Sequence, residues 1–160
     1  MASNFFARFE RIARSAHLFI EREDMPEAQL HPFDQRNIYP SFPPKVQRLF
    51  DDGYYAEATF EAFKFIDKKV RQHSKLKKSG YKLMMEAFHK DNPLIRLNAL
   101  QETSEEDEQE GFRFLFAGSA LAIRNPRGHE VDAQDDPDVC LDHLAFASLL
   151  LRRLEQAGFI

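Results

Sequence analysis

The sequence predicts an all-α protein, a bundle of four main helices with shorter helices between them. Apolar residues recur at intervals of three and four over four long segments, which is the period of an amphipathic α-helix. No segment alternates between apolar and polar residues in the way a half-buried strand does. The 160 residues are 43% hydrophobic and 30% charged, which is typical of one soluble domain with a substantial core.

The N-terminal part is predicted to hold one helix followed by an arm. Over about residues 5–19, apolar side chains recur every three or four residues, and most charged residues fall on the other face. Prolines between residues 26 and 44 then stop helix formation. Residues 25–43 still carry large apolar side chains, so we expect an arm that lies against the body rather than a flexible linker. We therefore divide one globular domain into residues 1–44, the helix and proline-rich arm, and residues 45–160, the bundle.

Local signals place the next helices. Pro44 suits the first turn of a short helix, which ends at the tight turn Asp51-Asp52-Gly53. A long helix follows over about Tyr54–Ser74, with apolar residues on one face. A break at Ser79-Gly80 precedes another helix, which runs through Phe88.

The next helix leads into the most informative stretch of the chain. Thr103 and Glu106 have the spacing of a capping box, which predicts a helix start. The helix should end near Arg124, because Asn125 precedes Pro126 and is disfavoured in the helical region.

The last helix is predicted to start near Pro137 and to run through Leu154. Its apolar residues cover more than one stripe. Such a helix is either central in the fold or part of an interface. Homodimerisation through this helix is therefore one expectation from the sequence.

Composition indicates a soluble cytoplasmic protein without a membrane partner. Cys140 is the single cysteine, which excludes an internal disulfide, fits a reducing compartment and suits a small core position. No apolar run approaches the roughly 18 residues of a membrane span. Charges interrupt the apolar residues at the N-terminus, as they would not in a signal peptide.

Residues 64–82 form a basic segment inside an acidic chain. Eight basic residues and one acid, Asp67, give this segment a local charge of +7, whereas the chain carries −4. One interpretation is a solvated helix face. The other is a surface that binds nucleic-acid phosphates, since Lys and Arg supply most non-specific affinity for nucleic acid.

The stretch Arg124–His129 contains groups suited to RNA cleavage without a metal. That reaction needs a base for the 2′-hydroxyl, a cation for the charge on phosphorus, and an acid for the leaving 5′-oxygen. His129 can serve as base or acid near neutral pH, and the guanidinium of Arg124 matches phosphate oxygens. Two copies of the chain meeting here would supply all three roles.

Other interpretations of the same residues remain open. Arg124 could cap the carbonyls at the end of its helix. His129 and the acids that follow it could bind a divalent metal, although their spacing fits no calcium-binding loop. Ser119 and Ser148 have no His-Asp pattern nearby in sequence, which argues against a serine nucleophile. His31, His89 and His143 are scattered without the spacing of metal ligands, so we expect structural or surface roles for them.

An ordered set of motifs resembles the Ymh family of uncharacterised prokaryotic proteins, placed within the HEPN superfamily. The resemblance covers roughly residues 45–157. It rests on Leu49-Phe50-Asp51-Asp52-Gly53-Tyr54, Gln109-Glu110-Gly111-Phe112, Ile123-Arg124-Asn125-Pro126 with His129, and Ser148-Leu149-Leu150 with Arg152-Arg153.

The resemblance implies a small helical bundle, often dimeric, that acts as a metal-independent endoribonuclease. In such domains an Arg, a polar residue after it and a His a few positions later are catalytic, which here implies Arg124, Asn125 and His129. The products would carry a 2′,3′-cyclic phosphate, and no cofactor or metal is expected. Similar enzymes are toxins or phage-defence (abortive infection) effectors, so RNA, a second copy, and an antitoxin or regulatory protein are the expected partners. The alternative is a catalytically inactive module that binds nucleotides or proteins.

Together with the basic segment, this interpretation predicts which residues contact RNA. They are Lys64, Lys68, Arg71 and Arg127.

Overall fold

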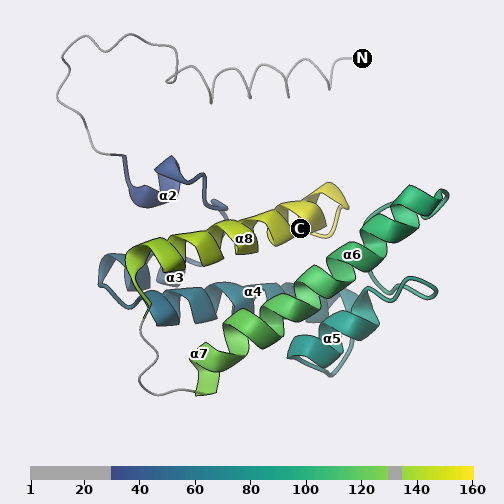
Figure 1. Ribbon diagram of the computed structural model, residues 1–160, viewed down its shortest axis with the longest axis horizontal. Coiled ribbons are helices and arrows are strands. Elements are labelled where there is room, and N and C mark those ends of the chain that lie inside the picture. Colours follow the sequence, from purple (N-terminus) through teal and green to yellow (C-terminus); the bar gives the residue numbers. More distant parts are fainter. Residues whose placement is uncertain (1–29, 130–134) are drawn as a thin grey trace, which may run out of the picture.

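The computed structural model describes residues 30–129 and 135–160, in which every regular element is helical (Figure 1). The prediction of an all-α fold is therefore confirmed. The helix predicted over residues 5–19 lies outside the described residues, as do residues 130–134. Within the described residues, no helix has both the length and the apolar character needed to cross a membrane.

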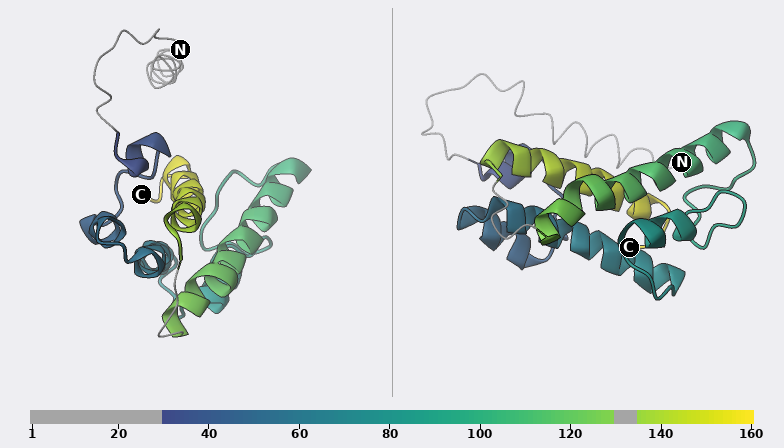
Figure 2. Two further views of the ribbon diagram at one scale, coloured as in Figure 1. Left: turned by 60° about the vertical axis from the view of Figure 1, so that its left-hand side comes forward. Right: turned by 60° about the horizontal axis from the view of Figure 1, so that its bottom comes forward.

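The centre of the fold is formed by α4 (Tyr55–Ser74) and α8 (Pro137–Gln156), which lie side by side along the molecule (Figures 1 and 2). Leu144, Leu150 and Leu151 of α8 are fully buried. The broad apolar surface of α8 therefore reflects its central position, because α4 packs along it and the segment before α4 is bonded to it at Ser148. The exceptions are Leu149 and Val139, of which 49% and 38% of the surface are exposed.

A long helical run crosses this pair at an angle (Figure 1). It consists of α6 (Thr103–Ser119), the π-helical turn η2 (Ala120–Arg124) and α7 (Asn125–His129). The short helix α5 (Gly80–Ala87) packs against α6, and the rings of Phe88 and Phe116 stack there with centroids 4.4 Å apart. Aromatic stacking of this kind contributes to the core beyond simple area burial.

The start of α6 differs from the prediction by one residue. Glu102 is the N-cap and Thr103 is already helical, so the predicted capping box does not form. Instead, the carboxylate of Glu105 accepts a hydrogen bond from the N–H of Gln101 at 2.6 Å. This contact satisfies a backbone donor just before the helix and places negative charge where the helix dipole favours it.

The segment before α4 lies against the bundle. It contains α2 (Pro32–Gln35) and α3 (Pro44–Asp51), and the side chains of Ile38, Tyr39 and Phe42 between them are buried. The N–H of Tyr39 donates to Oγ of Ser148 in α8 at 2.9 Å, which fixes this segment to the centre of the fold.

Candidate active site

The helix does not end at Arg124, so this prediction from Pro126 is wrong. The N–H of Asn125 donates to the carbonyl of Ala120, five residues back, and the chain continues as α7 to His129. In an α-helix the ring of Pro126 would clash with the carbonyl four residues earlier and would leave it unpaired. The wider π turn before the proline relieves this clash and keeps the helix intact. The backbone of His129 therefore lies at the end of a helix, not in a loop; its side chain lies outside what the structure describes.

The ring of Phe60 in α4 is the point where three elements meet. The guanidinium carbon of Arg124 lies 5.7 Å from the ring centroid, and Nζ of Lys64 lies 5.8 Å from it. A Cβ atom at Gly128 would come within 2.7 Å of the ring, so α7 approaches Phe60 as closely as it does only because residue 128 is glycine. This arrangement joins the predicted catalytic arginine to the predicted RNA-binding lysine through one aromatic side chain.

Arg124 is held without an acidic partner among the described residues. Its Nε is buried and has no hydrogen-bond acceptor there. Its Nη1 lies 3.3 Å from where a Cβ of Gly80 would stand, so α5 also borders it. A buried, unpaired donor on a cation is costly, and native proteins keep such groups for a reason such as ligand binding.

Asp67, the single acid of the basic segment, is buried and positions α5. Its Oδ1 accepts the N–H of Gly80 at 2.5 Å, at the first residue of α5. Gly80 has a φ of +58°, a conformation that a residue with a side chain adopts only with strain. The carboxylate is therefore engaged in structure, and it does not neutralise the exposed bases around it.

A second cluster joins α7 to the start of α8. Arg127 donates from Nε and Nη2 to the two carboxylate oxygens of Asp135, each at 2.6 Å, and from Nη1 to the carbonyl of Ile123 at 2.9 Å. The two charged side chains are only 12% and 11% exposed. Arg127 was predicted to contact RNA; its guanidinium is already occupied, so that role stays a prediction that requires this ion pair to open.

His143 of α8 completes this cluster. Its Nδ1 is buried without a hydrogen-bond partner among the described residues and lies 3.9 Å from Oδ2 of Asp135. Burial lowers the pKa of His143, and the nearby charge of Arg127 lowers it further, while Asp135 and Asp142 act in the opposite direction. The imidazole is thus held in its neutral form next to a charged pair.

The remaining candidates from the sequence are not arranged for chemistry. The hydroxyls of Ser119 and Ser148 donate to helix carbonyls at 2.7 and 2.6 Å, respectively, and both side chains are buried. Burial raises the pKa of Cys140 to about 11, as expected of a core thiol. Among residues 30–129 and 135–160, no group of three His, Cys, Asp or Glu side chains could hold a metal ion. Of the alternative metal site after Arg124, the side chains of His129, Glu130 and Asp132 fall outside what the structure describes. Asp135 is paired with Arg127, and Asp136 accepts the N–H of Val139 at the start of α8.

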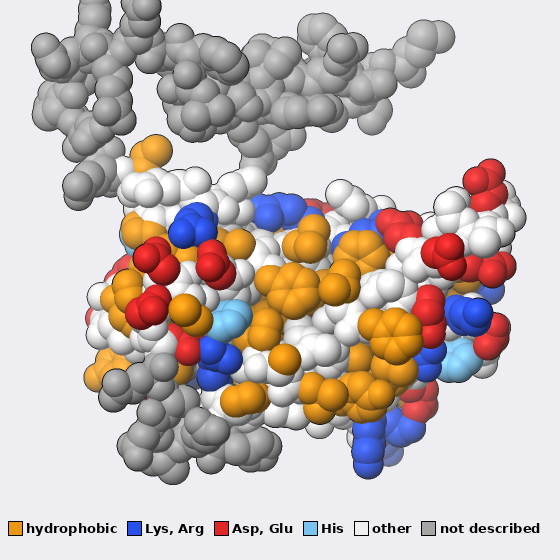
Figure 3. Space-filling model, viewed as in Figure 1, with side chains coloured by type: hydrophobic (Ala, Val, Ile, Leu, Met, Phe, Trp, Pro, Cys, Tyr) orange, Lys and Arg blue, Asp and Glu red, His pale blue; other side chains and the backbone are white. Residues whose placement is uncertain are grey.

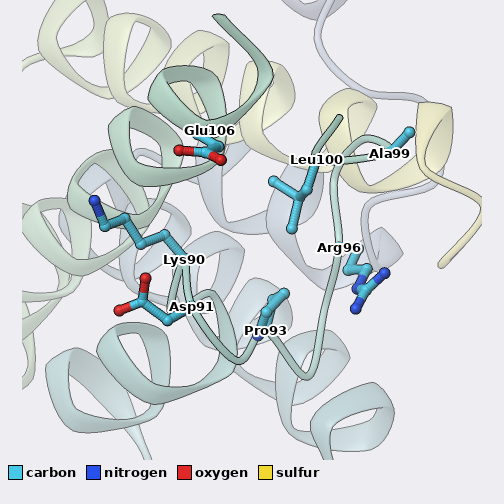
Figure 4. A pocket seen from close by; sticks show the side chains of 7 residues that line it. All are labelled: Lys90, Asp91, Pro93, Arg96, Ala99, Leu100 and Glu106. Atoms are coloured by element: carbon cyan, nitrogen blue, oxygen red, sulfur yellow. The ribbon is translucent and has the colours of Figure 1, made fainter. Parts of the chain in front are cut away.

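A shallow polar cavity of about 310 Å³ lies far from Arg124, where the α5–α6 connection meets the start of α6 (Figure 4). It is lined by Lys90, Asp91, Pro93, Arg96, Ala99, Leu100 and Glu106. Its charges are of both signs and balance, so it offers no clear preference for an anion or a cation.

The sequence interpretation missed Phe60, Asp67, Asp135 and His143 as neighbours of the site. Of these four residues, Asp67 alone was marked by the sequence pattern, because it is the single acid in the basic segment 64–82. Phe60 is four residues before Lys64, which suggests contact between those two but does not indicate Arg124.

Comparison with curated proteins and with solved structures gave no match. A family profile matches residues 36–154, which is well over half of the chain. The family is described as "protein of unknown function (Hypoth_ymh)", and the motifs around Phe50, Arg124 and Leu149 lie within the matched residues. The chain therefore belongs to the Hypoth_ymh family.

Proposed function

We propose that this protein is a metal-independent endoribonuclease of the HEPN type that cleaves RNA by attack of the 2′-hydroxyl and leaves a 2′,3′-cyclic phosphate. The observation that carries the proposal is the state of Arg124. Its cation rests on an aromatic ring, its Nε donor is unpaired among the described residues, and no carboxylate there neutralises it. A phosphate oxygen is the partner that best satisfies such a donor.

Each predicted residue has a role in this reaction. Arg124 stabilises the charge that develops on phosphorus, because a preorganised cation acts most strongly where water is excluded. His129 acts as general base or general acid. Asn125, directly after Arg124, orients the substrate or His129. Lys64 lies over the same ring as Arg124 and extends the positive surface along α4.

A second copy of the chain would complete the site. Arg124 and His129 of one chain supply one cation and one imidazole, whereas the reaction needs a base, a cation and an acid. Two copies would supply two of each residue. On α6, Phe114 (55% exposed) and Leu115 (42%) form an exposed apolar stripe that continues through Leu121 (50%) of η2 toward Arg124. Figure 3 shows hydrophobic side chains gathered on the face that α6 crosses.

Two glycines support this stripe, rather than α8, as the dimer surface. Gly111 and Gly118 are exposed within α6, and a Cβ at either would meet nothing within 4 Å. A glycine in a helix interior costs about 1 kcal/mol relative to alanine. Close approach of a second helix gives a reason for that cost. In the cell, we place the enzyme among toxins or phage-defence effectors, held in check by an antitoxin or regulatory protein.

The test is RNA cleavage in the presence of EDTA. Wild type is compared with His129→Ala and Arg124→Ala. His89→Ala and Arg96→Ala serve as matched controls, because both side chains lie in the connection between α5 and α6. We expect cleavage with cyclic-phosphate ends by wild type and both controls, and loss of at least 100-fold, on the order expected for a general acid or base, in the two site variants. Equal cleavage by wild type and His129→Ala, or none by wild type across diverse RNAs, would refute the proposal.

A second candidate is a catalytically inactive module that binds a protein or nucleotide. The observation in its favour is the acidic start of α6, where Glu102, Glu105 and Glu106 gather about 30 Å along the helix from Arg124 (Figure 3). Toxicity on expression separates the candidates. An enzyme is toxic as wild type and harmless as His129→Ala, whereas a binding module has the same effect in both forms.

A further inference from the structure

One face of α4 carries a row of exposed bases that we call the basic ridge, defined as Lys64, Lys68, Arg71 and Lys75. They recur at intervals of four, three and four, so they form one stripe about 16 Å long. Lys64 shares Glu61 with Lys45 at 3.1 Å each. Although burial pulls the pKa of Glu61 upward, the hydrogen bonds from the two lysines lower it overall, so this acid stays ionised.

The outer part of the ridge has no such partner. Lys68, Arg71 and Lys75 form no ion pair with any residue in the described ranges. Asp67, which follows Lys64 by three positions, is buried and bonded to Gly80. The ridge therefore presents unneutralised positive charge to solvent, as a phosphate-binding surface requires.

The candidate active site borders this ridge along one side. At about 100° per residue, Phe60 and Asp67 lie about 40° and 60° from Lys64, in the same direction around α4. Phe60 contacts Arg124, and Asp67 holds the start of α5. Arg124 and α5 thus form a continuous flank next to the ridge.

Tyr81 is the second residue of α5. It follows Gly80, whose backbone adjoins both Asp67 and Arg124, and it is 41% exposed. Within the described part of the chain, its ring stacks on no other ring and its hydroxyl forms no hydrogen bond. Lys82 follows it directly, and Figure 3 shows Lys and Arg side chains at the edge of the molecule next to α5. An exposed aromatic ring among bases is the arrangement with which proteins bind single-stranded nucleic acid.

We propose that the basic ridge and Tyr81 form a binding site for single-stranded RNA, with backbone phosphates along α4 and one nucleobase stacked on Tyr81 beside Arg124. The inference rests on the proposed function and names its substrate class. A duplex keeps its bases paired and stacked on each other, so its base faces are not available to Tyr81. The ridge is also a single row, which follows one backbone rather than two.

The test measures binding apart from cleavage. A fluorescent 2′-O-methyl RNA single strand lacks the attacking hydroxyl, so its anisotropy on titration with the full chain reports affinity alone. The duplex of the same sequence is the comparison. Tyr81→Ala, Tyr81→Phe and the double variant Lys68→Ala/Arg71→Ala are measured beside two controls. Tyr54→Ala removes a tyrosine that is even more exposed, at 55%, and that lies about 20 Å along α4 from Asp67. Lys90→Ala removes a base at the distant cavity.

We expect the single strand to bind more tightly than the duplex. Tyr81→Ala weakens single-strand binding roughly ten-fold or more, as loss of one stacked base predicts, while Tyr81→Phe keeps it. The double variant lowers the slope of log affinity against log salt by about 1.4, since each phosphate contact on a single strand contributes about 0.7. Neither control changes affinity by more than about two-fold. Far-ultraviolet circular dichroism verifies that every variant is folded.

Three results would overturn this inference. They are equal affinity for duplex and single strand, an unchanged affinity in Tyr81→Ala, and the same loss in Tyr54→Ala as in Tyr81→Ala. Binding as expected by a protein that cleaves no RNA would leave this site standing and refute only the proposed ribonuclease activity.

Discussion

The buried amide of Gln109 gives the sharpest prediction for stability. Its side chain is fully buried in α6 and makes three hydrogen bonds to the backbone that connects α5 to α6. Oε1 accepts the N–H of Leu97 at 2.9 Å, and Nε2 donates to the carbonyls of Phe88 at 3.1 Å and Ile95 at 3.0 Å. One side chain thus provides hydrogen bonds for three backbone groups in the interior of the protein.

Gln109→Leu keeps the volume of the side chain and removes all three bonds. Each bond contributes about 1 kcal/mol net, and each backbone group left unpaired in the interior adds a desolvation cost. The added apolar contact offsets part of this loss. We therefore expect the free energy of unfolding to fall by about 3 kcal/mol, which lowers Tm by about 10 °C for a chain of this size.

Urea denaturation followed by circular dichroism measures the effect. Gln47→Leu in α3 is the matched control, because Gln47 is exposed, and its substitution should change stability by no more than about 0.5 kcal/mol. An unchanged m-value for both variants would show that the unfolding reaction is the same. A loss of less than about 1 kcal/mol in Gln109→Leu would refute the assignment of these three bonds.

Three further predictions concern the surroundings of the site. Folding lowers the pKa of His143, so the unfolded chain binds a proton at this imidazole more readily than the folded chain does. The free energy of unfolding should therefore be at its full value above about pH 6.5 and fall as the pH drops. His143→Gln should reduce this dependence of Tm on pH in thermal denaturation. An identical pH slope in both proteins would contradict the burial of that imidazole. Gly80→Ala should lower the free energy of unfolding by about 1–2 kcal/mol, because residue 80 has a left-handed backbone, and its new methyl group should displace Arg124. RNA cleavage should therefore fall further than in the control Gly53→Ala, where φ is also positive but the space around the residue is open. If the two variants cleave RNA alike, the contact between residues 80 and 124 has no catalytic consequence. Cys140, with its pKa raised to about 11, should react with a thiol reagent only after denaturant is added, and fast labelling of the native protein would show that the thiol is accessible.

Much of the fold could be predicted from local signals. Pro44, Gly80 and Pro137 each stand at the first residue of a helix, as their effects on the backbone suggest. The three- and four-residue spacing of apolar side chains then identified which faces of α4 and α8 are buried.

The candidate site was less accessible to this reasoning, for two physical reasons. First, Pro126 usually ends a helix, and no sequence pattern signals that a π turn will accommodate it. Second, the contacts that position Arg124 come from residues far away in the chain. Phe60 precedes it by 64 positions and Gly80 by 44, so only the folded arrangement of α4, α5 and η2 brings them together.

The π turn also determines the direction in which the side chains of α7 point relative to those of α6. A π turn uses one residue more than an α turn, so every position after Arg124 lags by about 100° behind a helical wheel drawn from Thr103. A wheel continued from α6 would therefore assign Arg127 and Gly128 to the wrong sides of α7. In the structure, the corrected phase turns Gly128 onto Phe60 of α4. The run therefore joins α6, which packs on α5, to α7, which packs on α4, without a loop between them. The extra residue of the π turn provides the rotation that lets each segment face its own neighbour.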